Sequence, residues 1–541
     1  MLGTMDPQIE LFDADELCGH LVPAESIHRK LADLGDRLFS DADFADMYEA
    51  RGRHSVPPSL LAKVMLLQTF EGTSDRETLH HVRCDLSWKV ALHLPLQDEG
   101  FHHTVLTYFR ERLRRSERPK RIFERFREVA IEAGLLTKRG TRVLDSTPIL
   151  SAVQTEDTVS MVRSAMRRLL NLLDAETRQQ AEAVLKRNDY DQLGKPAIEW
   201  DDEASRISLV DELARDALAV LEVLANLEVG PDIASTAEML ATVTGQDLEW
   251  DEPSGRFRIR RGVARDRVIS TVDPEARHSR KSSQGHFNGY KAHVAVDPET
   301  EFISEIHVAP ANVSDGAVAP DLLPELADED SEITVVGDTA YGTGPTRVAL
   351  GESGAAVVAK APPEHNSTGG FPKSDFKIDL SAAAATCPAG VTTTHVSRHA
   401  DGQRFQFPAV ACAQCPLRGD CTSSARGRTL HVGPYEAILA QARAFQRTEE
   451  FKVQYNGTRP TVERVISRLV RRGGRKARHR GRLRVQHWLE LKAAAENFAR
   501  MTTLGLIWTG PDGWGLANTG DSRPAGTLFI ARSAILARYV A

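Results

Sequence analysis

Three carboxylates in this 541-residue chain lie where they could do chemistry together. Asp145 follows the apolar pair Val143-Leu144, Asp338 follows the predicted buried strand Ile333–Val336 and Gly337, and Glu463 lies in a stretch with helical periodicity. Carboxylate oxygens are preferred ligands of Mg²⁺, which also binds substrate phosphates. Two ions bridged by shared carboxylates can activate a water or a 3′-hydroxyl and stabilise the leaving oxygen. These residue types therefore predict a two-metal site, with Mg²⁺ or Mn²⁺; for Asp145 or Asp338 alone, a turn or cap residue is the alternative.

Glu463 stands at the start of a long cationic segment. Residues 464–484 contain nine Arg, one Lys and no acid. Arginine matches phosphate geometry in a bidentate way, so a polyanion is the natural partner, although a solvated basic helix would have the same composition. The candidate DNA-binding residues are Tyr455, Arg459, Arg464, Arg468, Arg471, Arg472, Arg475 and Lys476, together with Arg112 and Arg115 from the basic run 110–127.

The element that carries Glu463 reads as a helix. Apolar residues recur at i, i+3, i+4, i+7 and i+8 from Val462 to Val470, which makes one apolar stripe. Pro460 suits a first helical turn, and Gly473-Gly474 ends the pattern. The spacing predicts a helix that begins near Pro460, with Glu463 at the edge of its buried face.

The two aspartates are predicted at the ends of strands in a mixed α/β sheet. The predicted strands are Thr141–Asp145, a hairpin of Tyr290–Val296 and Phe302–Val308, then Ile333–Val336 and Ala355–Ala359. An antiparallel hairpin combined with helix-linked parallel strands makes a mixed sheet. Carboxylates at the ends of neighbouring strands can meet at one edge, and a helix packed across that edge can supply the third.

The remaining organisation is largely helical. A capping box at Ser74–Glu77, after a buried helix and a turn at Gly72, gives the outline of a helix-turn-helix, which a plain helical bundle would share. The predicted domains are a helical N-terminal DNA-binding domain (1–138), the first core strand (139–150), a helical insertion without strands (151–265), the main core (266–361), a cysteine-containing insertion (362–445), the core helices with Glu463 (446–503) and a tail (504–541).

Four of the six cysteines cluster late, with the spacing C-x24-C-x2-C-x5-C at Cys387, Cys412, Cys415 and Cys421. One C-x2-C pair with two flanking thiols could build a tetrahedral Zn²⁺ site, although the last interval is irregular; ordinary free thiols are the alternative. Asp297 and Asp315 also lie near the predicted sheet. They are interpreted as a hairpin turn and a helix cap rather than as metal ligands.

Composition bounds the remaining possibilities. The net charge of −7 hides strongly basic and acidic stretches, so local patches say more about partners than the total does. No apolar run reaches transmembrane length, and the acidic N-terminus lacks a signal-peptide core. Six cysteines are too few for a disulfide framework at this length. A cytoplasmic protein without a membrane partner is expected.

Several of these segments resemble bacterial insertion-sequence transposases. VLDST around Asp145, VVGDTAYG around Asp338 and the Tyr455-x3-Arg459-x3-Glu463 spacing resemble the DDE signature of that family. GYKAHVAVD, PANVSD and the N-terminal GRHSVPPSLLAKVMLL are also similar. The resemblance covers residues 30–150 and 270–503. The commoner pattern has two residues between Tyr and Arg, and a basic residue where Val470 stands.

The resemblance implies the RNase H-like fold of the retroviral-integrase superfamily. It also implies a metal-dependent enzyme that cuts at terminal inverted repeats, joins 3′ ends to target DNA, and assembles on DNA as a homo-oligomer at the bacterial nucleoid. Two alternatives remain open: a catalytically silent DNA-binding derivative, and a structure-selective nuclease on the same fold. Metal-dependent nicking would distinguish an active transposase from the silent derivative. A requirement for specific ends, together with strand joining, would distinguish it from the nuclease.

Overall fold

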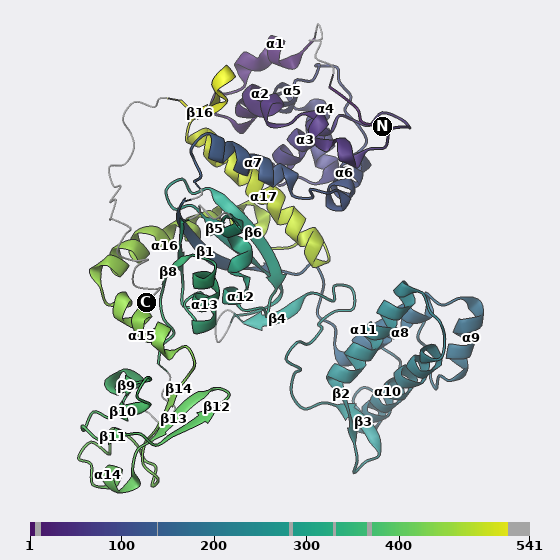
Figure 1. The fold of residues 1–541 in the computed structure, drawn as a ribbon. Coiled ribbons are helices and arrows are strands. Elements are labelled where there is room, and N and C mark those ends of the chain that lie inside the picture. Colours follow the sequence, from purple (N-terminus) through teal and green to yellow (C-terminus); the bar gives the residue numbers. More distant parts are fainter. Residues whose placement is uncertain (6–11, 138, 281–284, 328–331, 365–369, 518–541) are drawn as a thin grey trace.

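The computed structural model describes residues 1–5, 12–137, 139–280, 285–327, 332–364 and 370–517. A mixed six-stranded sheet lies at the centre, a helical region covers one end, and two smaller lobes project from the other (Figure 1). The predicted α/β class with a mixed sheet is confirmed. None of the helices in the described ranges is long and apolar enough to span a bilayer.

The central sheet is built around its first strand. β1 pairs with β5 in an antiparallel way and with β7 in a parallel way, β8 extends the parallel side, and both β4 and β6 pair with β5. The predicted hairpin (β5 and β6) and the predicted strands β1, β7 and β8 are confirmed, whereas β4 was not predicted. The strands are β1 (Arg139–Leu150), β4 (Arg277–Arg280), β5 (His286–Val296), β6 (Ile303–Pro310), β7 (Glu332–Gly337) and β8 (Ala356–Ala359).

Short helices connect the later strands. α13 (Gly344–Glu352) links β7 to β8, in line with the predicted helix-linked parallel strands. Between β6 and β7 the chain forms α12 (Asp315–Val318) followed by two 3₁₀ turns that begin at Pro320 and Pro324. Proline lacks the backbone N–H that a continuing helix needs, which explains the break.

The N-terminal region is helical, as predicted. Ser74 Oγ accepts a hydrogen bond from the Glu77 N–H, and the Glu77 carboxylate accepts one from the Ser74 N–H, so the capping box is confirmed. Gly72 closes the preceding helix with a φ of +78°, which glycine adopts without strain. The helices are α1 (Ala14–Cys18), α2 (Ile27–Leu38), α3 (Pro58–Glu71), α4 (Asp75–Cys84), α5 (Leu86–Leu92), α6 (Thr104–Arg115) and α7 (Arg121–Glu132).

The late helix α17 (Arg482–Thr503) ties this helical region to the sheet. It packs against α3 and α7 on one side and against β6 on the other (Figure 1). The rings of Phe126 and Phe498 lie 5.6 Å apart, and one hydrophobic core runs from the N-terminal helices through the sheet to α17. The predicted boundary at residue 138 is therefore a change of secondary structure within one continuous core.

The predicted tail contains ordered structure. A hairpin of β15 (Leu506–Trp508) and β16 (Trp514–Leu516) follows α17 and packs against the N-terminal helices. The Trp514 N–H donates to the Glu132 carboxylate over 3.0 Å. Residues 518–541 of the predicted tail lie outside the described residues.

The predicted helical insertion has its own core and lies apart from the sheet (Figure 1). A hairpin of β2 (Leu248–Asp251) and β3 (Arg256–Ile259) follows its last helix, so the prediction that this insertion lacks strands is wrong. Its helices are α8 (Thr158–Leu170), α9 (Ala175–Ala183), α10 (Glu203–Ala225) and α11 (Pro231–Asp247).

The cysteine-containing insertion forms a small β lobe with a separate core of six buried residues. Two three-stranded sheets make up this lobe, which projects below the central sheet (Figure 1). The elements are β9 (Lys377–Asp379), β10 (Ala384–Thr386), β11 (Thr392–Thr393), β12 (Val396–His399), β13 (Gly402–Gln406), α14 (Ala409–Ala413) and β14 (Thr429–Val432).

The chain returns to the central sheet through α15 (Glu436–Gln446) and α16 (Glu449–Leu469). The prediction that the helix carrying Glu463 begins near Pro460 is wrong, because α16 begins at Glu449 and contains Pro460. The Thr448 hydroxyl caps the helix at the Phe451 N–H. Burial of Phe451 and Tyr455 stabilises the half of α16 that precedes Pro460. Pro460 itself is exposed, and the helix continues through it.

Candidate functional site

Asp145 and Asp338 lie beside each other on neighbouring parallel strands. Val143 of β1 is opposite Val336 of β7, so two further residues along each chain bring Asp145 level with Asp338. Neighbouring strands are about 4.8 Å apart, which brings the two carboxylates into direct electrostatic contact. Asp338 follows the end of β7, as predicted. The prediction that Asp145 ends its strand is wrong, because β1 continues to Leu150.

Helix α16 brings the third carboxylate to the same place. Tyr455, Arg459 and Glu463 recur every four residues and therefore share one face of α16, which packs on β1, β5 and β7. Arg459 Nη2 lies 2.9 Å from Asp145 Oδ2. Glu463 is exposed, and all three carboxylates line one groove with a volume of about 640 Å³. We call this cavity the carboxylate groove.

The carboxylate groove disfavours a full set of negative charges. Burial raises the pKa of Asp145, and the neighbouring Asp338 raises it further, although the Arg459 guanidinium and the Ser146 N–H act in the opposite direction. Burial disfavours the charge on Arg459, but Asp145 and Asp338 outweigh this effect and raise its pKa. Arg459 is thus the cation that balances the two aspartates.

A buried tyrosine lies close to these carboxylates. Tyr341 is fully buried, and its hydroxyl has no hydrogen-bond partner among the described residues. Burial raises its pKa well above the usual value, and Asp315, Asp145 and Asp338 raise it further. A neutral hydroxyl donor near three carboxylates is therefore part of the electrostatic environment of the groove.

Two residues in the carboxylate groove were missed as functional candidates. Asp315 lines the groove together with Lys291, and these side chains form an ion pair. The Ser146 hydroxyl donates to Asp315 Oδ2 over 2.7 Å. Both residues lie in segments that carry the family resemblance, which is the only indication that the sequence offered. Asp297, by contrast, accepts the Thr300 N–H in the hairpin turn, as predicted.

Several arginines of the basic segment are engaged within the protein. Arg464 and Arg468 both pair with Glu301, at 2.8 and 2.6 Å, and Arg468 and Arg472 both pair with Glu496. Each of these three arginines would have to leave a carboxylate to bind phosphate. Their immediate effect is to fasten α16 to α17 and to the β5–β6 turn.

The later part of the basic segment reaches the carboxylate groove. Arg475 lines it and donates to the Pro148 carbonyl over 3.2 Å, and the Leu150 N–H donates to the Arg475 carbonyl over 2.9 Å. The end of β1 therefore holds this segment against the groove, while Arg471 and Lys476 are exposed.

The two predicted arginines of the earlier basic run lie on α6. Arg112 stacks over the Tyr48 ring at 4.8 Å. Arg115 pairs with Glu111 at 2.8 Å and is 79% exposed. Neither residue lines the carboxylate groove. Any contact that they make with DNA is therefore away from the three carboxylates.

The donors in the carboxylate groove match a hard divalent cation by type. Asp145, Asp338, Asp315 and Glu463 offer carboxylate oxygens, which Mg²⁺ and Mn²⁺ prefer. Within the described ranges, no three Asp, Glu, His or Cys side chains are close enough to hold a metal ion as they stand. Arg459 pairs with Asp145, so an ion bound by Asp145 would have to compete with this ion pair.

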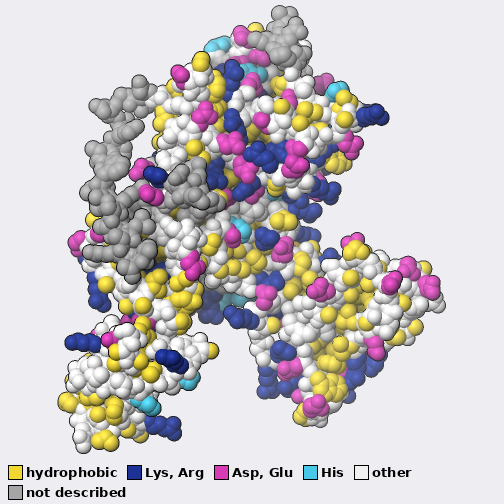
Figure 2. All heavy atoms as spheres, viewed as in Figure 1, with side chains coloured by type: hydrophobic (Ala, Val, Ile, Leu, Met, Phe, Trp, Pro, Cys, Tyr) yellow, Lys and Arg dark blue, Asp and Glu magenta, His cyan; other side chains and the backbone are white. Residues whose placement is uncertain are grey.

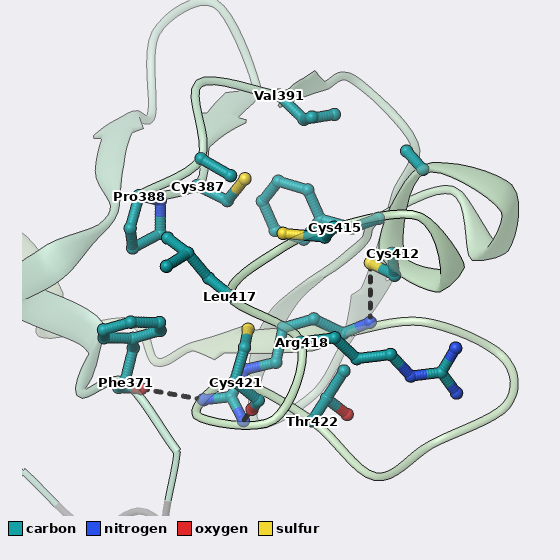
Figure 3. Close-up of a pocket in the computed structure, with 14 residues that line it drawn as sticks. Phe371, Cys387, Pro388, Val391, Cys412, Cys415, Leu417, Arg418, Cys421 and Thr422 are labelled. Carbon is teal, nitrogen blue, oxygen red and sulfur yellow. Dashed lines mark hydrogen bonds between the residues drawn. The ribbon is translucent and has the colours of Figure 1, made fainter.

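The four late cysteines surround one small cavity in the β lobe (Figure 3). Cys387, Cys412, Cys415 and Cys421 line a volume of about 30 Å³, together with Phe407 and Leu417. The Arg428 N–H donates to Cys412 Sγ over 3.5 Å. Burial raises the pKa of the Cys421 thiol. All six cysteines are described, and none forms a disulfide.

Comparison with known protein families gives two matches. The Transposase DDE domain family matches residues 386–502, which include α16 with Glu463 and most of α17. The family described as Transposase domain (DUF772) matches residues 16–112 of the helical region. Neither the curated proteins nor the solved structures contain a match. Both matches, one in the helical region and one across the site helix, are to transposase families, and together they indicate an insertion-sequence DDE transposase.

Proposed function

We propose that this transposase binds the terminal inverted repeats of its element, cuts the DNA there and joins the 3′ ends to target DNA. One observation carries the proposal: Asp145 and Asp338 lie in register on parallel strands, and Glu463 lines the same groove. The mixed sheet, with a hairpin on one side of β1 and parallel strands on the other, supports the RNase H-like core that the resemblance implies.

Asp145, Asp338 and Glu463 are the proposed ligands of two Mg²⁺ or Mn²⁺ ions. Such ions would activate the attacking oxygen and stabilise the leaving oxygen. The chain itself positions the strand: Arg475 and Lys291 line the carboxylate groove and offer charge-assisted hydrogen bonds to backbone phosphates. Arg459 balances Asp145 until the ions bind, which keeps the apo site folded. Arg471 and Lys476 are exposed and extend the proposed DNA surface.

The proposed division of labour follows the continuous core. The helical region 1–138, completed by α17, would hold element ends, and residues 139–150, 266–361 and 446–503 would form the catalytic core. Assembly of several copies on DNA is part of the proposal, because two ends must be joined in one event.

The test is incubation of the full chain with labelled DNA that carries the repeats flanking its gene. With Mg²⁺, nicks at the repeat ends and joined products are expected; with EDTA, neither should form. Binding without any nicking in Mg²⁺ or Mn²⁺ would mean a catalytically silent protein. Cleavage of branched DNA without specific ends or joining would mean a structure-selective nuclease.

We also propose that the β lobe binds one Zn²⁺ through Cys387, Cys412, Cys415 and Cys421. The four thiols surround a single cavity of about 30 Å³, and the core of the lobe contains only six buried residues. Small lobes of this kind usually need a metal or a disulfide to remain folded. The four sulfurs must close around the ion, because in the described residues no three of them are within ligand distance.

Cys415→Ser is expected to remove the bound zinc and destabilise the lobe. About one Zn per chain should copurify with the wild type in chelator-free buffer, and almost none with the variant. Elemental analysis and limited proteolysis of the lobe measure both effects. Cys84→Ser is the matched control, because Cys84 is an exposed thiol on α4. Wild-type protein without stoichiometric zinc would overturn the proposal.

A further inference from the structure

A second charged cavity lies where the helical region meets the start of α17. It has a volume of about 520 Å³ and is lined by α3, the turn before α4, α6 and residues 478–492. On the face shown in Figure 2, Lys and Arg side chains gather at this junction. We call it the basic basin. Its walls carry more cations than acids: Arg110, Arg114, Arg478, Arg484 and Lys492 against Asp75 and Glu111.

The two acids form ion pairs with only two of these cations. Arg110 pairs with Asp75, and Arg114 pairs with Glu111. Arg478 donates to the carbonyl of Gly72 over 2.8 Å, and Lys492 donates to the carbonyl of Arg472 over 2.6 Å. Carbonyl contacts leave the positive charge in place. The basic basin is therefore built with an excess of positive charge.

Arg484 is the cation best placed to receive a ligand. Its side chain is exposed at the rim of the basic basin. Within the part of the chain that the structure describes, it forms neither an ion pair nor a hydrogen bond. A ligand could thus gain a bidentate contact at Arg484 without breaking any contact within the protein.

A buried histidine in the wall points to a missing hydrogen-bond partner. His487 is 6% exposed, and neither ring nitrogen has a hydrogen-bond partner among the described residues. Its Nδ1 lies 3.7 Å from the Glu490 carboxylate, beyond hydrogen-bond range. Buried polar groups in folded proteins nearly always have partners, so a polar ligand or solvent is expected beside this ring.

The same positive charge acts on the other titratable groups of the wall. Burial, together with Arg110 and Arg114, lowers the pKa of His479 to about 4. Burial, together with Arg478 and Arg472, lowers the pKa of Lys492 to about 8. A bound anion would reverse these repulsions, and phosphate oxygens would satisfy the imidazole and guanidinium donors.

The basic basin and the carboxylate groove share one stretch of chain. Arg475 lines the groove, and Arg478, three residues later, lines the basin. Three residues span at most about 10 Å. The basin also joins the two matched regions, since Arg110 belongs to residues 16–112 and residues 478–492 belong to 386–502. A single DNA strand could therefore contact both cavities and both regions.

We propose that the basic basin binds a backbone phosphate of the DNA strand whose neighbouring phosphates enter the carboxylate groove. This inference rests on the proposed function, which supplies the DNA. A phosphate held in the basin would clamp α6 of the helical region onto the basic segment. End recognition and strand positioning would then be coupled through one contact.

The test compares Arg484→Gln with Arg480→Gln in the full chain. Both arginines are exposed in or beside the basic segment, both changes remove one charge, and Arg480 does not line the basin. Fluorescence anisotropy with labelled duplex DNA should show binding weakened about tenfold by Arg484→Gln, and a salt slope smaller by about 0.9, as for one lost phosphate contact. Arg480→Gln should have a clearly smaller effect.

Three outcomes separate the possible failures. Equal losses for Arg484→Gln and Arg480→Gln would overturn the basin site and leave the proposed function standing. Wild-type protein that binds no DNA even at low salt would overturn both. A second arm uses inorganic phosphate against chloride at matched ionic strength. If phosphate raises the Tm of the wild type but not of Arg484→Gln, while the wild type and Arg484→Gln bind DNA equally, the basin holds free phosphate and the DNA assignment is wrong.

Discussion

Asp338→Asn is expected to reduce metal-dependent cleavage of element-end DNA by at least about a thousandfold, or about 4 kcal/mol of transition-state stabilisation. The change removes a charged ligand beside Asp145 but keeps the size of the side chain. DNA binding should stay close to wild type, because it depends on cations such as Arg475 rather than on the carboxylates. Single-turnover nicking and anisotropy with the same DNA measure the two quantities.

Three further variants test whether this loss of cleavage is specific to the proposed metal ligands. Asp145→Asn and Glu463→Gln should show losses of similar size, since each removes a proposed ligand from the same groove. Glu450→Gln is the control, because Glu450 lies on the same helix α16, near its start, and does not line the groove. If Asp338→Asn protein cleaves within about tenfold of wild type, Asp338 is not a metal ligand.

Arg459→Gln is expected to destabilise the metal-free protein by about 3 kcal/mol, because it leaves a largely buried Asp145 beside Asp338 without a cation. The loss should be largest at neutral pH, where Asp145 must be ionised. It should shrink in acid, because burial and Asp338 already raise the pKa of Asp145 and protonation removes the repulsion. Added Mg²⁺ should restore more stability to the variant than to the wild type.

Urea unfolding in EDTA and in Mg²⁺ measures these differences. Arg464→Gln is the matched control on the same helix, because Arg464 is 56% exposed and pairs with Glu301 at the surface. Loss of such an exposed pair costs about 1 kcal/mol or less. Equal destabilisation by Arg459→Gln and Arg464→Gln would show that Arg459 does not balance the aspartates.

Features specified by neighbouring residues could be predicted from the sequence. The Ser74–Glu77 capping box and the β5–β6 hairpin depend on short-range patterns, and the structure has both. Asp338 follows a short apolar strand, so its position at the end of β7 was also predictable. The helical nature of residues 12–132 follows from the same kind of local periodicity.

Features specified by contacts between distant residues could not be predicted. Pro460 resembled a helix start, but burial of Phe451 and Tyr455 against the core extends α16 back to Glu449. Tertiary packing therefore outweighed the local preference of proline. The three-residue gap between Tyr455 and Arg459 is a four-residue step along α16, which places Arg459 in the lining of the groove.

The ion pairs of the site were equally hidden. Arg464 and Arg468 meet Glu301, which lies more than 160 residues earlier in the chain, so their engagement is invisible to a scan for basic runs. Lys291 and Asp315 meet only because β5 and α12 reach the same groove. Charge patterning therefore located the basic segment but did not show which of its arginines remain available for DNA.

The most direct measurement is the position of Mn²⁺ in crystals of the DNA-bound protein, from its anomalous scattering. The predicted result is anomalous density in the carboxylate groove between Asp145 and Asp338, within ligand distance of both, with Glu463 turned towards it and the Arg459–Asp145 ion pair opened. Mn²⁺ bound elsewhere, with DNA in place and Arg459 still paired to Asp145, would contradict the assignment of these three carboxylates.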